Sequence, residues 1–181
     1  MSENDLLVPE EKADGSFAER VLDYQTALMG KTLVVDANVP IMFDYTVVGA
    51  AWGSNTGVIA LHLGSNVTSI VDSAFTDCAG LIGDVVFPSQ CTTIGSQAFY
   101  YCAGLERIFI GEGCTSIGDY AFAGCTGVTT INCLALAAPT LLGSSCFQDV
   151  GTTGIHVPSA GTSGYDAAWE SAAGLTVNYD L

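Results

Sequence analysis

Residues 67–81 read VTSIVDSAFTDCAGL, residues 91–105 read CTTIGSQAFYYCAGL, and residues 114–128 read CTSIGDYAFAGCTGV. The three segments are copies of one pattern, and their starts are offset by 24 and then 23 residues. Two less similar copies flank them, VVGAAWGSNTGV at residues 47–58 and LLGSSCFQDVG at residues 141–151. Self-similarity at a fixed period of this length is the signature of a repeat architecture, so we expect about five stacked coils.

Equivalent positions of the copies carry equivalent residue types. The aromatic position holds Trp52, Phe75, Phe99, Phe122 and Phe147, and the aliphatic position five residues earlier holds Val47, Ile70, Ile94, Ile117 and Leu142. A glycine and then an aliphatic residue follow, at Gly57-Val58, Gly80-Leu81, Gly104-Leu105 and Gly127-Val128. We expect the apolar residues to face the core. We expect the glycines to adopt backbone conformations that other residues avoid.

The seven cysteines contain no C-x-x-C pair, and five of them fall at repeat positions. Cys78, Cys102 and Cys125 stand three residues after each Phe, and Cys91 and Cys114 form a second column. This placement predicts buried, reduced thiols that act as small apolar residues, and it disfavours a disulfide framework or a zinc site.

Short runs with alternating hydrophobicity lie between the repeated segments. They are LHL at residues 61–63, VVF at 85–87, IFI at 108–110, INC at 131–133 and IHV at 155–157. One strand, one turn and a return path fit into each repeat of about 23 residues, so neighbouring coils should align their strands in one parallel sheet. The sequence therefore predicts an α/β repeat solenoid.

The segments TSIGDYAFAGCTGV at residues 115–128 and VFPSQCTTIG at residues 86–95 resemble the BspA-like leucine-rich repeats. Units of that family read as an Ile-Gly-x-x-Ala-Phe-x-x-Cys-x-x-Leu run followed by a strand and a Pro-Ser turn. The resemblance covers about residues 47–158 and departs from the pattern at Trp52, at Asn55 and over residues 134–142. It implies a scaffold for adhesion or protein contact in bacteria, phages and some protists, and it implies no catalytic residues.

Both ends of a solenoid need a cap. Residues 1–31 are expected to form an acidic arm and a helix over residues 16–29, which Ser16 and Glu19 begin with a capping box. Residues 32–158 would form the solenoid with its N-terminal cap, and residues 159–181 the C-terminal cap, with a helical piece at 164–173 where Tyr165 and Trp169 cover the last coil. The first fifteen residues have no partner pattern of their own and would fray in an isolated domain. We expect a neighbouring subunit or a larger assembly to hold them.

The charge excludes several classes of partner. The chain has 181 residues, with 19 Asp and Glu against four Lys and Arg, for a formal charge of −15. Nucleic acid and anionic membranes should be repelled. We find no secretory signal and no apolar run long enough to span a bilayer.

The outward positions of the predicted strands form the candidate interaction surface. They are His62, Val86, Phe109, Asn132 and His156, with Arg107 alongside. Outward positions of a one-sided sheet should be polar, and Val86 and Phe109 break that rule. Three explanations are open at this point: contact with another chain, cover by the N-terminal helix or its preceding arm, and ordinary exposure.

Catalysis is not expected. The chain has no nucleophile-elbow, zincin, Walker or dinucleotide signature. The two His residues should lie roughly 19 Å apart, too far to share a proton or a metal. Asp72 and Asp119 share a column, but a separation of about 10 Å is too long for a calcium cage. We therefore expect no enzyme activity, no cofactor and no metal.

These observations predict a structural scaffold that contacts proteins. The first hypothesis is a phage virion component, either a capsid decoration or cement protein or a tail-associated protein, bound through its N-terminal arm and outer sheet face. Its partners would be other virion subunits, with a homo-oligomer as one form, and its location the virion. The alternative is a bacterial adhesion or ligand-binding module, located at the cell surface or in the cytoplasm.

Overall fold

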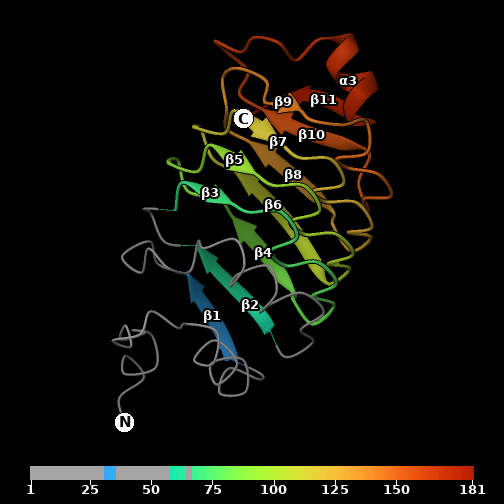
Figure 1. Ribbon diagram of the computed structural model, residues 1–181. Helices are drawn as coiled ribbons and strands as arrows, with labels where there is room; N and C mark the ends of the chain where they lie inside the picture. The colour runs from blue at the N-terminus through green and yellow to red at the C-terminus, as the bar shows by residue number, and fades with distance from the viewer. Residues whose placement is uncertain (1–30, 36–57, 64–66) are drawn as a thin grey trace.

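A stack of parallel strands forms the body of the protein (Figure 1). The computed structural model describes residues 31–35, 58–63 and 67–181. Its longer strands are β1 (Lys31–Val35), β2 (Val58–Leu63), β4 (Gly83–Val86), β6 (Leu105–Ile110), β8 (Thr130–Cys133), β10 (Gly154–Val157) and β11 (Thr176–Tyr179). β1 and β2 pair in a two-stranded parallel sheet, and β2 lies beside β4. The order β4-β6-β8-β10-β11 forms a five-stranded parallel sheet. The predicted repeat solenoid is thus confirmed.

A separate parallel sheet of short strands corrects the expectation of a single sheet. It consists of β3 (Ser69–Ile70), β5 (Thr93–Ile94), β7 (Ser116–Ile117) and β9 (Thr140–Leu141). Each of its strands holds two residues, too few to show alternating hydrophobicity in the sequence. Two further strands, β1 and β11, were also not predicted, and β11 forms the edge of the longer sheet beyond residue 158.

The aromatic column forms a ladder along the core. The ring centroids of Phe75 and Phe99 lie 5.1 Å apart, those of Phe99 and Phe122 5.6 Å, and those of Phe122 and Phe147 5.6 Å, all in stacked orientation. Phe87, from the strand side, packs edge-on against Phe99 and Phe122. All five rings are buried. The predicted Phe positions are therefore confirmed as core, while Trp52 lies outside the described residues.

The aliphatic column is confirmed at Ile70, Ile94 and Ile117, but the expectation for Leu142 is wrong. Leu142 is 59% exposed, and the strand register pairs Ile117 with Leu141 instead. The amide of Leu142 donates to Ile117 O, just as the amide of Gly118 donates to Ile94 O in the preceding coil. Leu142 therefore occupies the repeat position of Gly118. The fifth coil thus has one extra residue between its short strand and its Phe, which the sequence alignment of the copies conceals.

The glycines of the repeat are required because neighbouring coils approach each other closely. The expected reason, a backbone conformation that other residues avoid, is wrong for these positions. Neither Gly104 nor Gly127 has a positive φ. A Cβ added to Gly104 would lie 2.6 Å from Leu81 O, and one added to Gly127 would lie 2.4 Å from Ala103 O. The same holds in the Ile-Gly motif, where a Cβ on Gly118 would lie 2.3 Å from the amide nitrogen of the preceding coil. Only glycine lets two backbones approach this closely.

The C-terminal coil is covered by α3 (Ala167–Ala173), which lies within the expected segment. Asp166 caps its N-terminus by accepting from two backbone amides, and Gly174 ends it with φ 69°. Tyr165 is buried and its hydroxyl donates to Ala135 O at 2.9 Å. Trp169 is partly buried against the core, and its Nε1 donates to Pro139 O at 2.9 Å. The expected N-terminal helix and arm lie outside the described residues.

Removing the central ring of the Phe ladder should destabilise the whole stack. We expect Phe99→Ala to lower the free energy of unfolding by about 3–5 kcal/mol, because the ring is fully buried and its loss leaves a cavity between two coils. Urea denaturation followed by circular dichroism measures this. A loss under about 1 kcal/mol would contradict the assignment of this column to the core.

Candidate functional site: the outward face of the long sheet

The strand register brings four of the predicted surface residues into one row. Val86 pairs with Phe109, Phe109 with Asn132, and Asn132 with His156. The row ends at Asn178, which pairs with His156 from β11. His62 pairs with a residue of β1 in the adjoining two-stranded sheet, and its side chain lies outside the part of the chain that the structure describes. The row therefore contains one residue from each strand of the five-stranded sheet.

The β4–β6 end of this row is apolar and accessible. Val86 is 55% exposed and Phe109 is half-buried, whereas the next residue inward on each strand, Val85 and Ile108, is fully buried. Alternation thus places Val86 and Phe109 on the outer side of the sheet. Asn132 is half-buried. An exposed valine beside an accessible aromatic ring is the feature that distinguishes this face.

Arg107 borders the apolar pair, and two interactions fix its guanidinium. Its Nε donates to Asp84 Oδ1 at 2.8 Å and its Nη2 to Asp84 Oδ2 at 2.5 Å, a bidentate pair across β4 and β6. Its Cζ lies 5.7 Å from the centroid of the Phe109 ring, within cation–π range. The hydrogen bond to Asp84 raises the pKa of Arg107. The cation is therefore held over the ring as part of the same surface.

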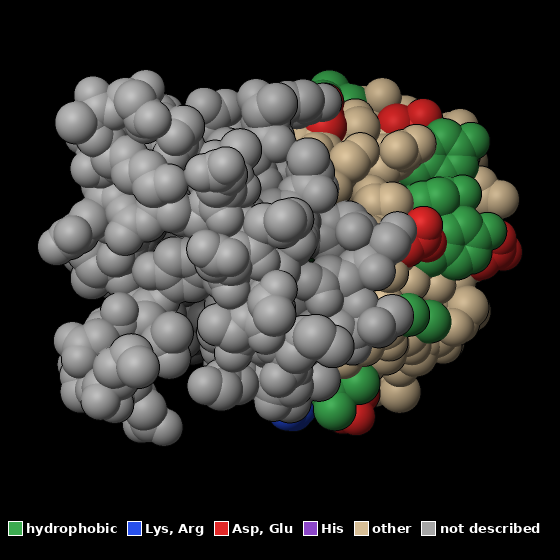
Figure 2. All heavy atoms as spheres, turned by 60° about the horizontal axis from the view of Figure 1, so that its bottom comes forward, with side chains coloured by type: hydrophobic (Ala, Val, Ile, Leu, Met, Phe, Trp, Pro, Cys, Tyr) green, Lys and Arg blue, Asp and Glu red, His purple; other side chains and the backbone are tan. Residues whose placement is uncertain are grey.

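Acidic side chains outnumber basic ones in the described part of the chain, and on the face drawn in Figure 2 some of them lie beside hydrophobic side chains. Residues 67–181 contain ten Asp and Glu but one basic residue, Arg107. No charged side chain among the described residues is buried. The surface around the sheet would thus attract cationic rather than anionic partners.

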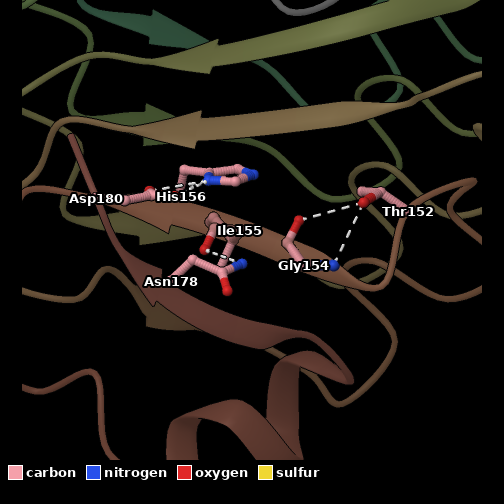
Figure 3. A network of polar contacts seen from close by, with 6 residues as sticks. All are labelled: Thr152, Gly154, Ile155, His156, Asn178 and Asp180. Carbon is pink, nitrogen blue, oxygen red and sulfur yellow. Dashed lines mark hydrogen bonds and ion pairs between the residues drawn. The ribbon is translucent and has the colours of Figure 1, made fainter.

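At the C-terminal end of the row the chemistry changes from apolar to polar. His156 Nδ1 lies 2.9 Å from both carboxylate oxygens of Asp180 (Figure 3). Asn178 Nδ2 donates to Ile155 O at 3.5 Å, and Thr152 Oγ1 accepts from the amide of Gly154 at 3.3 Å. The contact of Asn178 joins β11 to β10, and the contact of Thr152 joins β10 to the turn that precedes it. His156 acts here as a link between two strands.

The two acids weighed as calcium ligands instead hold turn amides. Asp72 Oδ1 accepts from Ser96 N at 2.7 Å, and Asp119 Oδ1 accepts from Tyr120 N at 3.1 Å and from Ser145 N at 3.3 Å. Within residues 31–35, 58–63 and 67–181, no group of three or more His, Cys, Asp or Glu side chains could hold a metal ion. In the same residues no helix is long and apolar enough to cross a membrane.

Comparison with known families identifies the repeat. The model of the BspA type leucine rich repeat region matches residues 50–176 in six copies. The chain belongs to the BspA-type leucine-rich repeat family. The match extends beyond residue 158 to the start of β11, further than the resemblance in the sequence had indicated. No curated protein and no solved structure gives a significant match to the chain.

Membership explains the architecture and the class of function. Leucine-rich repeats of this family generally serve as scaffolds for protein contact rather than as enzymes. The expected interaction surface is the sheet, because each coil contributes one outward side chain per strand position at a fixed spacing. The row from Val86 to His156 lies on this sheet.

The cysteines of the BspA-type repeat have a role that sequence reasoning missed. Cys102 Sγ donates to Phe75 O at 3.0 Å, and Cys125 Sγ donates to Phe99 O at 3.1 Å, so each thiol bonds to the preceding coil. All seven cysteines are buried and none forms a disulfide. Their burial was predicted, but the hydrogen bonds were not. The sequence signal for these hydrogen bonds was that cysteine, rather than alanine, stands three residues after the Phe in successive copies.

Burial of these thiols should make the repeat sensitive to alkali. Burial raises the pKa of Cys125 from its ordinary value of 9.0 to about 12, and that of Cys91 to about 11. A raised pKa stabilises the fold while the thiol is protonated, so the free energy of unfolding should fall as the pH rises from about 9 to about 12. Urea denaturation across this range measures the fall, and Cys125→Ala should reduce the slope. Stability that stays constant from about pH 8 to pH 11 would contradict the prediction.

Proposed function

We propose that this chain is a non-enzymatic protein-contact scaffold whose contact surface is the outward face of β4, β6 and β8. The observation that carries the proposal is the exposed Val86 beside the accessible ring of Phe109, at one end of a row that is polar elsewhere. A soluble sheet gains nothing from apolar side chains facing water, whereas an interface buries them.

The composition of this surface supports contact with a protein. Aromatic residues and Arg are enriched at protein interfaces, and energetically dominant residues cluster at their centres. Here Arg107 is pre-oriented by Asp84 and lies over Phe109, so little side-chain entropy would be lost on binding. Asn132 and His156 supply hydrogen-bonding groups along one side of the row. An apolar pair with polar groups beside it fits a protein partner better than a small molecule.

We further propose that the scaffold is a structural component of a phage virion, held through the sheet face and the N-terminal arm. Two properties support an external position on a particle. Ten acids against one base in residues 67–181 would repel packaged nucleic acid, and the continuous buried core gives a rigid unit that copies of a shell protein could bind repeatedly. Family membership favours the second candidate, a bacterial adhesion or ligand-binding module.

The sheet face can be tested by adding a charge at its centre. We expect Phe109→Asp to leave the far-ultraviolet circular dichroism spectrum unchanged. Binding of the protein to the proposed virion should weaken about tenfold or more, because the ring is lost and a charge must be desolvated. Gln90→Asp is the matched control, since it adds the same charge at an exposed turn. Equal binding of both variants and the parent protein would remove this face from the proposal.

The virion setting has its own test. Particles from the source organism are banded on a density gradient, and peptides of this protein are quantified against those of the major shell protein by mass spectrometry. A virion component should give a fixed, high ratio in the particle band. Absence from that band would exclude the virion setting and leave the adhesion module, without affecting the test of the sheet face.

A further inference from the structure

A second accessible aromatic cluster lies away from the sheet, on the turns that lead into it. Tyr100 and Tyr101 stand in the turn before β6, and Tyr120 stands in the equivalent turn of the next coil. The ring centroids of Tyr100 and Tyr101 are 4.4 Å apart, and those of Tyr100 and Tyr120 are 6.0 Å apart. Tyr101 is 51% exposed, and the other two rings are half-buried. We call these three residues the tyrosine cluster.

Two members of the tyrosine cluster have an unfavourable backbone conformation. Tyr101 has φ 57° and Tyr120 has φ 56°, both in the left-handed region that bulky residues avoid. The position of Tyr101 holds Asp77, Gly124 and Asp149 in other coils, and the position of Tyr120 holds Ser73 and Gln97. Asp and Gly tolerate this conformation well. The same positive φ occurs at these positions in the other coils, so the conformation belongs to the repeat, and what distinguishes this pair of turns is the large aromatic side chain at one such position in each.

The neighbouring coil makes room for the exposed ring. A Cβ added to Gly124 would lie 2.7 Å from a ring carbon of Tyr101, so the ring lies against a backbone that carries no side chain. A hydrogen bond with Tyr101 raises the pKa of Tyr100, and the carboxylate of Asp77 acts in the same direction. The hydroxyl of Tyr100 therefore stays neutral at physiological pH, and the cluster presents its rings beside the exposed carboxylate of Asp77.

We propose that the tyrosine cluster and Asp77 form a docking site for a basic segment of a partner protein, one that presents Arg side chains. Guanidinium groups stack on tyrosine faces and pair with carboxylates, and the cluster together with Asp77 offers both across three consecutive coils. The charge of the chain supports the same partner. The single basic residue of residues 67–181, Arg107, already pairs with Asp84, so within those residues no Lys or Arg is left to neutralise the acids around the cluster.

This site goes beyond the proposed sheet face and is separate from it. The tyrosines of the cluster stand in the turns before β6 and β8, whereas Val86 and Phe109 lie near the far ends of β4 and β6. In Figure 2, hydrophobic and acidic side chains lie next to each other along the edge of the described part, the combination that a basic segment requires. A scaffold with two such surfaces could join two different chains.

The test uses a synthetic peptide of alternating Arg and Gly, titrated into the full chain by calorimetry at about 0.15 M salt to screen diffuse attraction. We expect Tyr101→Asn and Asp77→Asn each to weaken binding about tenfold, since each removes one partner of the guanidinium. Glu112→Gln is the matched control, because it removes one exposed charge at the opposite end of β6 and should change binding less than about twofold. Phe109→Asp should also leave peptide binding unchanged.

Folding does not confound this experiment. Asn tolerates the left-handed conformation, so Tyr101→Asn should melt at or above the temperature of the parent protein while losing affinity for the peptide. Equal weakening by Asp77→Asn and Glu112→Gln, with normal binding by Tyr101→Asn, would show diffuse electrostatic attraction and overturn the proposal. So would an absence of peptide binding, or Tyr101-dependent binding of a neutral oligosaccharide in place of the peptide.

Discussion

The backbone contact between one coil and the next is the interaction on which the rest of the structure depends. The amide of Phe75 donates to Ala98 O at 2.7 Å, and that of Phe99 donates to Ala121 O at 2.8 Å, so each turn segment bonds to the following coil as the strands do. One coil cannot bury its apolar side alone, and burial comes from stacking. The spacing set by these bonds aligns the Phe rings, places thiols under carbonyl groups and leaves no room for a Cβ at the repeated glycines.

The same contact determines what the surface can do. Because the coils are held in one register, the outward side chains of successive strands form straight rows. The chemical character of the surface at one position therefore depends on which residues stand beside it in the neighbouring coils. Val86 and Phe109 form an apolar pair because the register places them side by side. Tyr100 and Tyr120 meet because their turns belong to adjacent coils. The scaffold thus combines a constant interior with variable faces, which suits a protein-contact role.

The local exceptions to the repeat lie at the ends and at the surface. The fifth coil has an extra residue before its Phe, and it adjoins the Ala-rich segment and the C-terminal cap, where regular stacking stops. At the cap, Tyr165 and Trp169 donate to backbone carbonyl groups of residues 135 and 139, and so satisfy acceptors that the last coils would otherwise leave to a further repeat. The strained tyrosines lie on the outside, where they do not disturb the core.

The sequence by itself determined the solenoid, its Phe ladder, the burial of its cysteines and the outward row from Val86 to His156, because periodicity reports which residues share an environment. It did not determine the sheet of two-residue strands, because those strands are too short to show a pattern. It did not determine the exposure of Leu142 either, because this one-residue slip is set by hydrogen bonding between coils. It also misassigned the reason for the glycines. Only the tertiary structure brought Arg107 over Phe109 and joined three tyrosines from two coils, because these contacts depend on distances between coils that no single repeat encodes.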